Sequence, residues 1–438
     1  MTDEVSPASP MARLFKTAGR VEPYEVRAVV LSFVFFFFLL GSYFILRPMR
    51  DAMGTIFGVE HLQELYTGTF IGTFALAPIY AAAAGRIKLS TLLPWVYGMI
   101  AISLLVFYAL FAADPEDRWT AAAFFIWVSV FNQLITSVFW SFMADLFSRK
   151  QSNRLYGLIT AGGSLGAVAG PSLTALLVTV VGTHTLLLIS AAGFVVTAVL
   201  VLLLVGEKEK LRVMGEDAQR TTLDHSLAWN PFAGFSLLAK SSYLLGIAAF
   251  IALSNWVAVI LYFQQQDFIS KAFVSVDERT QAFALVDVIV NVLSIGIQFF
   301  GTGWMVARFG VKKTLVFNPL LMIGALVVLA MVPGLWMVLF AQILRRTSDN
   351  ALARPSREML FTLVDQETKY KAKNVIDTVV YRFADLTGAW LQAGLAQFGV
   401  AGAGVALAGV GVSSLWAWNA ARIGRRYESH IGGDKISG

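Results

Sequence analysis

The sequence predicts an all-α, polytopic membrane protein with twelve transmembrane helices in two six-helix halves. The first observation is composition: the 438 residues are 57% hydrophobic and only 14% charged, whereas soluble proteins are about half apolar and about a quarter charged. The second is that apolar runs of about 20 residues recur along the chain, each long enough to cross a hydrocarbon core of about 30 Å. The third is a weak internal repeat.

Apolar windows bounded by charge, glycine or proline mark the individual spans. In the first half they lie near residues 28–57, 62–84, 91–113, 119–146, 155–179 and 183–205, and in the second half near 240–267, 281–307, 313–332, 335–348, 373–396 and 401–421. The predicted organisation is an N-terminal cytoplasmic tail (1–27), a six-helix half (28–205), a polar cytoplasmic linker (206–239), a second six-helix half (240–421) and a C-terminal cytoplasmic tail (422–438).

The repeat consists of three segments that recur in the second half at a nearly constant offset. The matched residues are Asp51 with Asp267, Pro94 with Pro319, and Tyr156 with Tyr381, at separations of 216, 225 and 225 residues. One duplicated six-helix unit explains this spacing better than chance.

Charge and rare residues exclude several classes of protein. Of the 34 Lys and Arg residues, 28 fall in one set of alternate loops, so both termini are expected in the cytoplasm. The net charge of +6 then serves topology and lipid contact, and no nucleic-acid partner is expected. Cysteine is absent and the four histidines are scattered, so neither a metal site nor another cofactor is expected.

Charged residues inside the apolar layer are the strongest functional candidates, because each costs several kcal/mol unless it is paired or hydrated. Arg47, Arg50 and Asp51 follow one of the most apolar runs and precede the apolar segment AMGTIFG. Pro48 is expected to break the helix within this group. Because guanidinium groups match carboxylate and phosphate, we expect an anion-binding element here, whereas the corresponding QQQD segment of the second half carries no cation.

The remaining intramembrane charges are acidic or paired. Asp287 is followed one turn later by Asn291, which suits a stripe facing a cavity. In the eleventh span Arg382 and Asp385 are three residues apart and share a helix face, while Asp377 and Arg382 do so only roughly. Structural pairing and substrate or proton handling both remain open for this group, and Asp385 or Asp377 is the candidate for proton coupling.

Polar and aromatic residues of two other spans could complete a binding site. Asn132, Gln133 and Trp140 in the fourth span and Asn255 in the seventh offer amide hydrogen bonds and a stacking surface. At the end of the fourth span, Asp145 is expected to pair with neighbouring basic residues.

The fifth span carries a stripe of small residues in TAGGSLGAVAGP. Gly162, Gly166 and Gly170 recur at a spacing of four, which lets two helices approach closely. Tight helix packing therefore explains the stripe sufficiently.

Two six-helix halves joined by a cytoplasmic loop resemble the major facilitator superfamily. The short basic turns GRIK and RFGVKK stand where that superfamily has its loops between the second and third and the eighth and ninth helices, and GAVAGP resembles its antiporter motif. The resemblance implies a substrate site between the halves and transport by alternating access.

Three segments are also similar to the ATP/ADP translocase family of nucleotide exchangers. They are YFILRPMRD, VFWSFMADLF and KYKAKNVIDTVVYRFADLTGAWLQ. The resemblance places Arg50 and Asp51 at the family's lysine and aspartate, and Asp377 and Arg382 at matching charges. The acidic residues that the family uses in the fourth and seventh spans are absent, and Asp385 stands at a family lysine, so the resemblance supports the fold more than ATP/ADP exchange.

The sequence thus predicts a monomeric secondary transporter of the inner (cytoplasmic) membrane and no enzyme. We expect it to carry a small organic anion, with nucleotides and other phosphorylated metabolites as candidates, together with protons or a counter-substrate. Substrate contacts are expected from Arg47, Arg50, Asn132, Gln133, Trp140, Asn255 and Arg382, and proton coupling or charge pairing from Asp51, Asp287, Asp377 and Asp385. The alternatives are a proton-driven exporter of amphipathic compounds and, from another class, a membrane sensor or enzyme.

Overall fold

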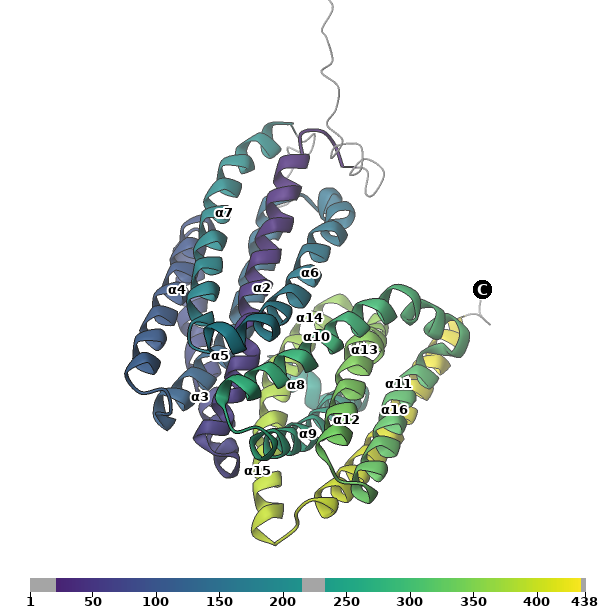
Figure 1. Ribbon diagram of the computed structural model, residues 1–438. Helices are drawn as coiled ribbons and strands as arrows, with labels where there is room; N and C mark the ends of the chain where they lie inside the picture. Colours follow the sequence, from purple (N-terminus) through teal and green to yellow (C-terminus); the bar gives the residue numbers. More distant parts are fainter. Residues whose placement is uncertain (1–20, 215–232, 435–438) are drawn as a thin grey trace, which may run out of the picture. The chain divides into compact units, whose positions relative to one another are not determined.

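The computed structural model describes residues 21–214 and 233–434, and these residues form helices without any β-strand. The ribbon in Figure 1 follows them in chain order, from purple to yellow. The all-α class predicted from composition is therefore confirmed. The predicted tails and linker lie partly outside the described residues.

Each of the twelve predicted spans coincides with one or more helices. The first six are α2 (Val26–Phe57), α3 (Leu62–Arg86), α4 (Leu89–Ala113), α5 (Arg118–Leu146), α6 (Arg149–Val181) and α7 (Leu186–Met214). The second six are α9 (Ser242–Ala272), α10 (Val276–Phe300), α11 (Thr302–Met331), α12 (Leu335–Ser348), α15 (Tyr381–Gln397) and α16 (Ala403–Asp434). Among the described residues, eight helices are long and apolar enough to cross a membrane: α2, α4, α5, α6, α7, α9, α10 and α11.

Shorter helical elements extend two of the predicted spans. A π-helical turn η2 (Asp349–Ala353) continues α12 into α13 (Arg354–Leu360). A second π-helical turn, η4 (Ile376–Val380), joins α14 (Gln366–Val375) to α15. The remaining short elements are η1 (Val59–His61), α8 (Ala233–Lys240) and η3 (Phe361–Leu363). Single π-turns inside helices occur often at functional sites, and both turns here lie beside charged residues.

Contacts divide the chain into two compact units. The first contains the residues up to Arg50 and Gly72–His225, and the second contains Asp51–Ile71 and the residues from Ser226 onward. The end of α2 and the start of α3 thus belong to the second unit. The division into two six-helix halves at residues 206–239 stays a prediction.

The first unit is built on close approach of α2 and α6. A Cβ atom added at Gly162, Gly166 or Gly170 would overlap with backbone carbonyl oxygens of α2, so these positions require glycine for steric reasons. The tight-packing interpretation of the stripe is thereby supported. Aromatic rings pack beside this contact: Phe35 lies edge-on to Tyr97, Phe139 and Phe142, with centroids 4.9–6.3 Å apart.

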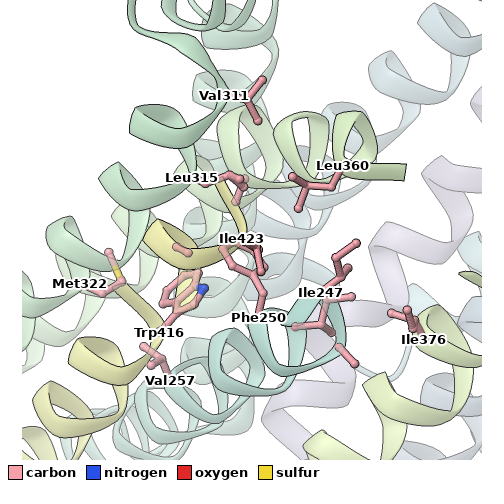
Figure 2. Close-up of a cluster of buried hydrophobic side chains, with 14 of the residues drawn as sticks. Ile247, Phe250, Val257, Val311, Leu315, Met322, Leu360, Ile376, Trp416 and Ile423 are labelled. Carbon is pink, nitrogen blue, oxygen red and sulfur yellow. The ribbon is translucent and has the colours of Figure 1, made fainter. Parts of the chain in front are cut away.

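The second unit is organised around α9, α11 and α16. Figure 2 shows its apolar core, with Ile247 and Phe250 from α9, Met322 from α11 and Trp416 from α16. Asn419 of α16 donates a hydrogen bond of 2.8 Å to the carbonyl oxygen of Gly246. Leu360 and Ile376 belong to the same core, so the segments that carry the two π-turns are anchored to it.

Candidate functional site

Arg47 and Arg50 are half-buried near the end of α2. Arg50 Nη1 lies 3.5 Å from the Ser129 hydroxyl on α5, and its guanidinium carbon lies 5.2 Å from the centroid of the Phe125 ring. Arg47 lies 5.8 Å from the ring centroid of Phe44. The guanidinium of Arg50 is therefore held against a hydroxyl and an aromatic face, which fixes its position while leaving part of it accessible.

The expectation that Pro48 breaks the helix at this group is wrong. Helix α2 runs without interruption from Val26 to Phe57, with Pro48 inside it. A proline removes one N–H donor and clashes with the preceding turn, but a membrane helix can absorb this through small local adjustments and contacts with its neighbours.

Asp51, the next residue, belongs to the second unit. Its side chain is buried, and its Oδ1 accepts a hydrogen bond of 2.9 Å from the Tyr262 hydroxyl on α9. One turn further along α2, the Thr55 hydroxyl accepts a hydrogen bond of 3.0 Å from Arg279 Nη1. Arg279 also donates to the carbonyl oxygen of Phe273, which follows α9. The end of α2 is thus fixed to α9 and α10 by polar contacts that sequence reasoning did not anticipate.

The candidate polar residues of α5 and α9 lie in different settings. Asn132 is half-buried on α5. The side chain of Gln133 is not among those that the structure describes. The Trp140 ring packs against Phe36, Phe139 and Tyr156 at centroid distances of 5.1–5.5 Å. Asn255 is buried on α9 and donates a hydrogen bond of 3.2 Å to the Tyr381 carbonyl oxygen of α15. Trp140 and Asn255 therefore contribute to packing in this structure.

Asp287 forms an ion pair with Arg346 that the sequence analysis did not predict. Arg346 Nη2 on α12 lies 2.5 Å from Asp287 Oδ1 on α10, and the two side chains are only 10% and 2% exposed. Arg345 and Arg346 both lie in the last turn of α12. One feature of the sequence could have indicated a polar site here: Gln342 and Arg346 are four residues apart, so both lie on the same face of the helix.

Amide groups continue this polar region toward α9. The Gln342 amide donates a hydrogen bond of 2.9 Å to Gln265 Oε1, and Arg345 Nε donates to Gln342 Oε1 at 3.0 Å. On another face of α12, the Ser348 hydroxyl donates to Asn318 Oδ1 on α11 at 2.7 Å. Helix α12 is therefore tied to α9, α10 and α11 by buried polar contacts.

The charges of the eleventh predicted span form a separate cluster around α13, α14 and α15. Arg382 Nη1 lies 3.7 Å from Asp385 Oδ2, as their spacing predicts. Asp377, in the π-turn η4, lies 3.5 Å from Arg357 of α13. Lys373 pairs with Glu358 and completes the contacts between α13 and α14. The pairing of Asp377 with Arg357 could not be read from the sequence, because their elements meet only in the tertiary structure.

Asp145 of α5, expected to pair locally, lies 2.5 Å from Lys208 Nζ of α7. The described residues contain no group of three or more His, Cys, Asp or Glu side chains that could hold a metal ion.

Comparisons with known proteins define the class. The family model of the Major Facilitator Superfamily matches residues 30–345, which is more than half of the chain. No curated protein matches this sequence. The chain is a multi-pass membrane transporter and not an enzyme. It belongs to the Major Facilitator Superfamily.

Solved structures with similar folds agree with this assignment. A crystal structure of the nucleoside transporter NupG has a TM-score of 0.62 at 14% identity and covers 92% of this chain and 99% of its own. A bacterial homologue of the iron transporter ferroportin, in the inward-facing state, gives 0.64 at 14% identity with coverage of 92% and 99%. A bacterial homologue of the human lysosomal transporter Spinster gives 0.61 at 14% identity, with 93% and 98%. These likenesses show the fold, and none points to the ATP/ADP translocase family.

Proposed function

We propose that this secondary transporter carries a small organic anion, with nucleotides and other phosphorylated metabolites as the first candidates. The observation that carries the proposal is the pair Arg47 and Arg50, two half-buried guanidinium groups one turn apart on α2. A permanent positive charge inside an apolar layer is costly and marks a substrate path by default. Its planar donors match the two oxygens of a carboxylate or phosphate.

The surroundings of Arg50 support this proposal. Phe125 gives the guanidinium an aromatic face and Ser129 adds a hydroxyl. Both residues are buried, and the Ser129 hydroxyl itself donates to the Phe125 carbonyl oxygen at 2.7 Å. They therefore hold the guanidinium of Arg50 in position to bind a carboxylate or phosphate.

We further propose that both termini lie in the cytoplasm, because Lys and Arg are concentrated in one set of alternate loops. A monomer in the cytoplasmic membrane is part of the same proposal. Proton coupling or exchange against a counter-substrate supplies the driving force, and Asp377 and Asp385 are partly buried carboxyl groups beside arginines. A reporter fused to the C-terminus and active only in the cytoplasm tests the orientation. A fusion that is produced but inactive contradicts it, and an otherwise identical fusion to a reporter that works only outside the cytoplasm would then be active.

Uptake into proteoliposomes tests the anion proposal directly. Radiolabelled ADP, glucose 6-phosphate and citrate are the probes, and we expect at least one of them to be accumulated. Arg50→Ala should abolish that uptake, and Arg50→Lys should keep the charge but lose the forked geometry, with about a tenfold loss for each 1.4 kcal/mol of lost binding. Arg118→Ala, at the start of α5, is the matched control.

Two outcomes contradict the proposal. Arg50→Ala protein that is folded and transports at the wild-type rate removes the assigned role of this residue, and the absence of uptake for every probe removes the anion class. Efflux of an amphipathic dye driven by a pH gradient, and lost in Asp385→Asn, would replace it with the exporter alternative.

A further inference from the structure

The Asp287–Arg346 pair is the most deeply buried ion pair among the described residues, and the proposed function does not use it. Its atoms lie 2.5 Å apart and neither side chain is more than 10% exposed. A buried pair rarely stabilises a fold more than apolar residues of the same volume would. Inside a membrane protein, such a pair is therefore a candidate for a working site.

Three buried polar side chains lie next to residues that hold α12 in place: Gln266 follows Gln265, Thr347 follows Arg346, and Asn318 accepts a hydrogen bond from Ser348. Gln266 of α9 is fully buried, and neither atom of its amide has a hydrogen-bond partner among the described residues. The same holds for the hydroxyl of Thr347, next to Arg346, and for the amide nitrogen of Asn318 on α11, both of which are also buried. Buried donors are normally satisfied by protein or water, so a set of donors on α9, α11 and α12 points to water or to a ligand rich in acceptors.

The pair can link the binding of a proton to the binding of an anion. Asp287 and an anionic ligand offer the same group, a pair of carboxylate or phosphate oxygens, to the same guanidinium. While Asp287 is ionised, it occupies Arg346 and excludes a second anion by like-charge repulsion. Once Asp287 takes up a proton, its charge is lost and Arg346 can bind the anion.

We propose that Arg346 is a second anion-binding residue and Asp287 the proton-binding residue that competes with the anion for it, so that one proton and one anion are bound together. This inference rests on the proposed transport of an organic anion and deepens it by naming the coupling site. It replaces Asp377 and Asp385 as the coupling carboxyl groups. The transporter is then a proton–anion symporter.

Charged groups on the elements packed against the pair have partners of their own. Arg345 precedes Arg346 on α12 and interacts electrostatically with it. Asp349, Arg354 and Tyr381 of α15 also interact electrostatically with Arg345. Asp349 is already bound by Arg354 at 3.0 Å. On α9, Asp267 is bound by Lys271 at 2.7 Å, and the α9 and α11 groups that contact α12, Gln265 and Asn318, are neutral. On α10, Arg279 is bound to backbone carbonyl groups.

The sign of the coupling follows from linkage. Because the proton and the anion favour the same state, each raises the affinity for the other. Anion binding should therefore tighten as the pH falls, by up to about tenfold per pH unit where one proton is taken up. A pH gradient that is acidic outside the vesicles should therefore concentrate the anion inside them.

The experiment measures the pH dependence of ADP and glucose 6-phosphate uptake by the full-length protein in proteoliposomes, between about pH 5.5 and about pH 8. Asp287→Asn has the same size and can still hydrogen-bond to Arg346, but it cannot titrate. We expect this variant to exchange anion at a rate independent of pH and to lose accumulation driven by a pH gradient. Asp267→Asn, which alters the exposed pair on α9, should behave as wild type. Arg346→Gln should abolish binding at every pH.

The outcomes separate this inference from the proposed function. If wild-type protein takes up the anion, but Asp287→Asn keeps the full pH dependence, the coupling role is wrong and anion transport stands. Folded Arg346→Gln that transports normally also overturns it. If Arg346→Gln does not fold, the Asp287→Asn result alone decides. If wild-type protein takes up neither anion, the proposed function and this inference fail together.

Discussion

The contact between α2 and α6 in the first unit differs in kind from the contacts of α12 in the second. Between α2 and α6, glycines such as Gly166 let the backbones of the two helices approach closely. Around α12, contacts are made by a charged pair and by amides, including Asp287 with Arg346 and Gln342 with Gln265.

This difference shows what each region is suited to do. Backbone contact through glycine depends on shape alone and makes a rigid joint that is insensitive to pH or ligand. Polar contacts around α12 are satisfied only in particular protonation and pairing states. The coupling that we propose therefore involves the polar contacts of α12, whereas the glycine contact between α2 and α6 is a structural one.

The largest loss of stability is expected from removing a charged residue from the polar contacts of α12. Asp287→Ala leaves the charge of Arg346 buried without its carboxylate, and a cost of about 3–5 kcal/mol is typical of such a change. The double variant Asp287→Ala, Arg346→Met should recover much of this loss because no charge is left behind. Unfolding by SDS titration in detergent micelles measures both.

Asp267→Ala is the control for that prediction. Its carboxylate belongs to an exposed pair with Lys271, whose side chain is 71% exposed, and such pairs contribute less than about 1 kcal/mol. Equal losses for Asp267→Ala and Asp287→Ala would contradict the assignment of a costly buried charge.

A smaller effect is expected on the apolar side. Gly166→Ala places a methyl group against the Phe37 carbonyl oxygen, so α2 and α6 must move apart, at a typical cost of about 1–3 kcal/mol. Gly157→Ala in the same helix meets nothing within 4 Å and should be neutral or stabilising by about 0.5–1 kcal/mol. Thermal melting of the two variants in the same detergent gives the comparison. Similar melting temperatures would show that the glycine contact is not tight.

The smallest effect is expected at a helix end outside the membrane layer. Asp117 caps α5, and hydrogen bonds from the Thr120 hydroxyl and from the backbone N–H groups of Thr120 and Trp119 lower the pKa of its carboxyl group. A lowered pKa in the folded state means that the stabilisation is complete above the unfolded value and is lost as pH falls through the folded value.

We therefore expect Asp117→Ala to lower the melting temperature by a constant amount at neutral pH, and the difference from wild type to shrink as the pH falls below about 4. Melting curves at a series of pH values measure this. A difference that stays constant down to the most acidic sample would show that the ionised carboxylate is not the stabilising group.

Most of the fold could be predicted from the sequence because membrane helices have a strong local signal. Runs of about 20 apolar residues must form helices in lipid, where every backbone N–H and C=O has to be satisfied within the segment. Even the short tenth span, Leu335–Ser348, begins and ends where the sequence places it. The pairing of Arg382 with Asp385 was also predictable, because both lie on one helix face three residues apart.

Less of the candidate site could be predicted, since its contacts join residues far apart in the chain. Arg346 did not stand out in the sequence, because Lys and Arg near the end of a span usually lie at the membrane surface. Its partner Asp287 lies on a different helix, and only packing of α10 against α12 brings the two together. Likewise, Pro48 indicated a break, but α2 continues through it.

By itself, the sequence determined that this chain is a multi-pass helical membrane protein, where its helices lie, and that cations stand near the end of the first span. These properties depend on hydrophobicity and backbone hydrogen bonding, which act along the chain. The tertiary structure decided which charges are neighbours: Asp51 with Tyr262, Asp377 with Arg357, and Asp287 with Arg346. Ion pairing depends on distances of a few ångströms between side chains on different helices, and only the packed helices set those distances.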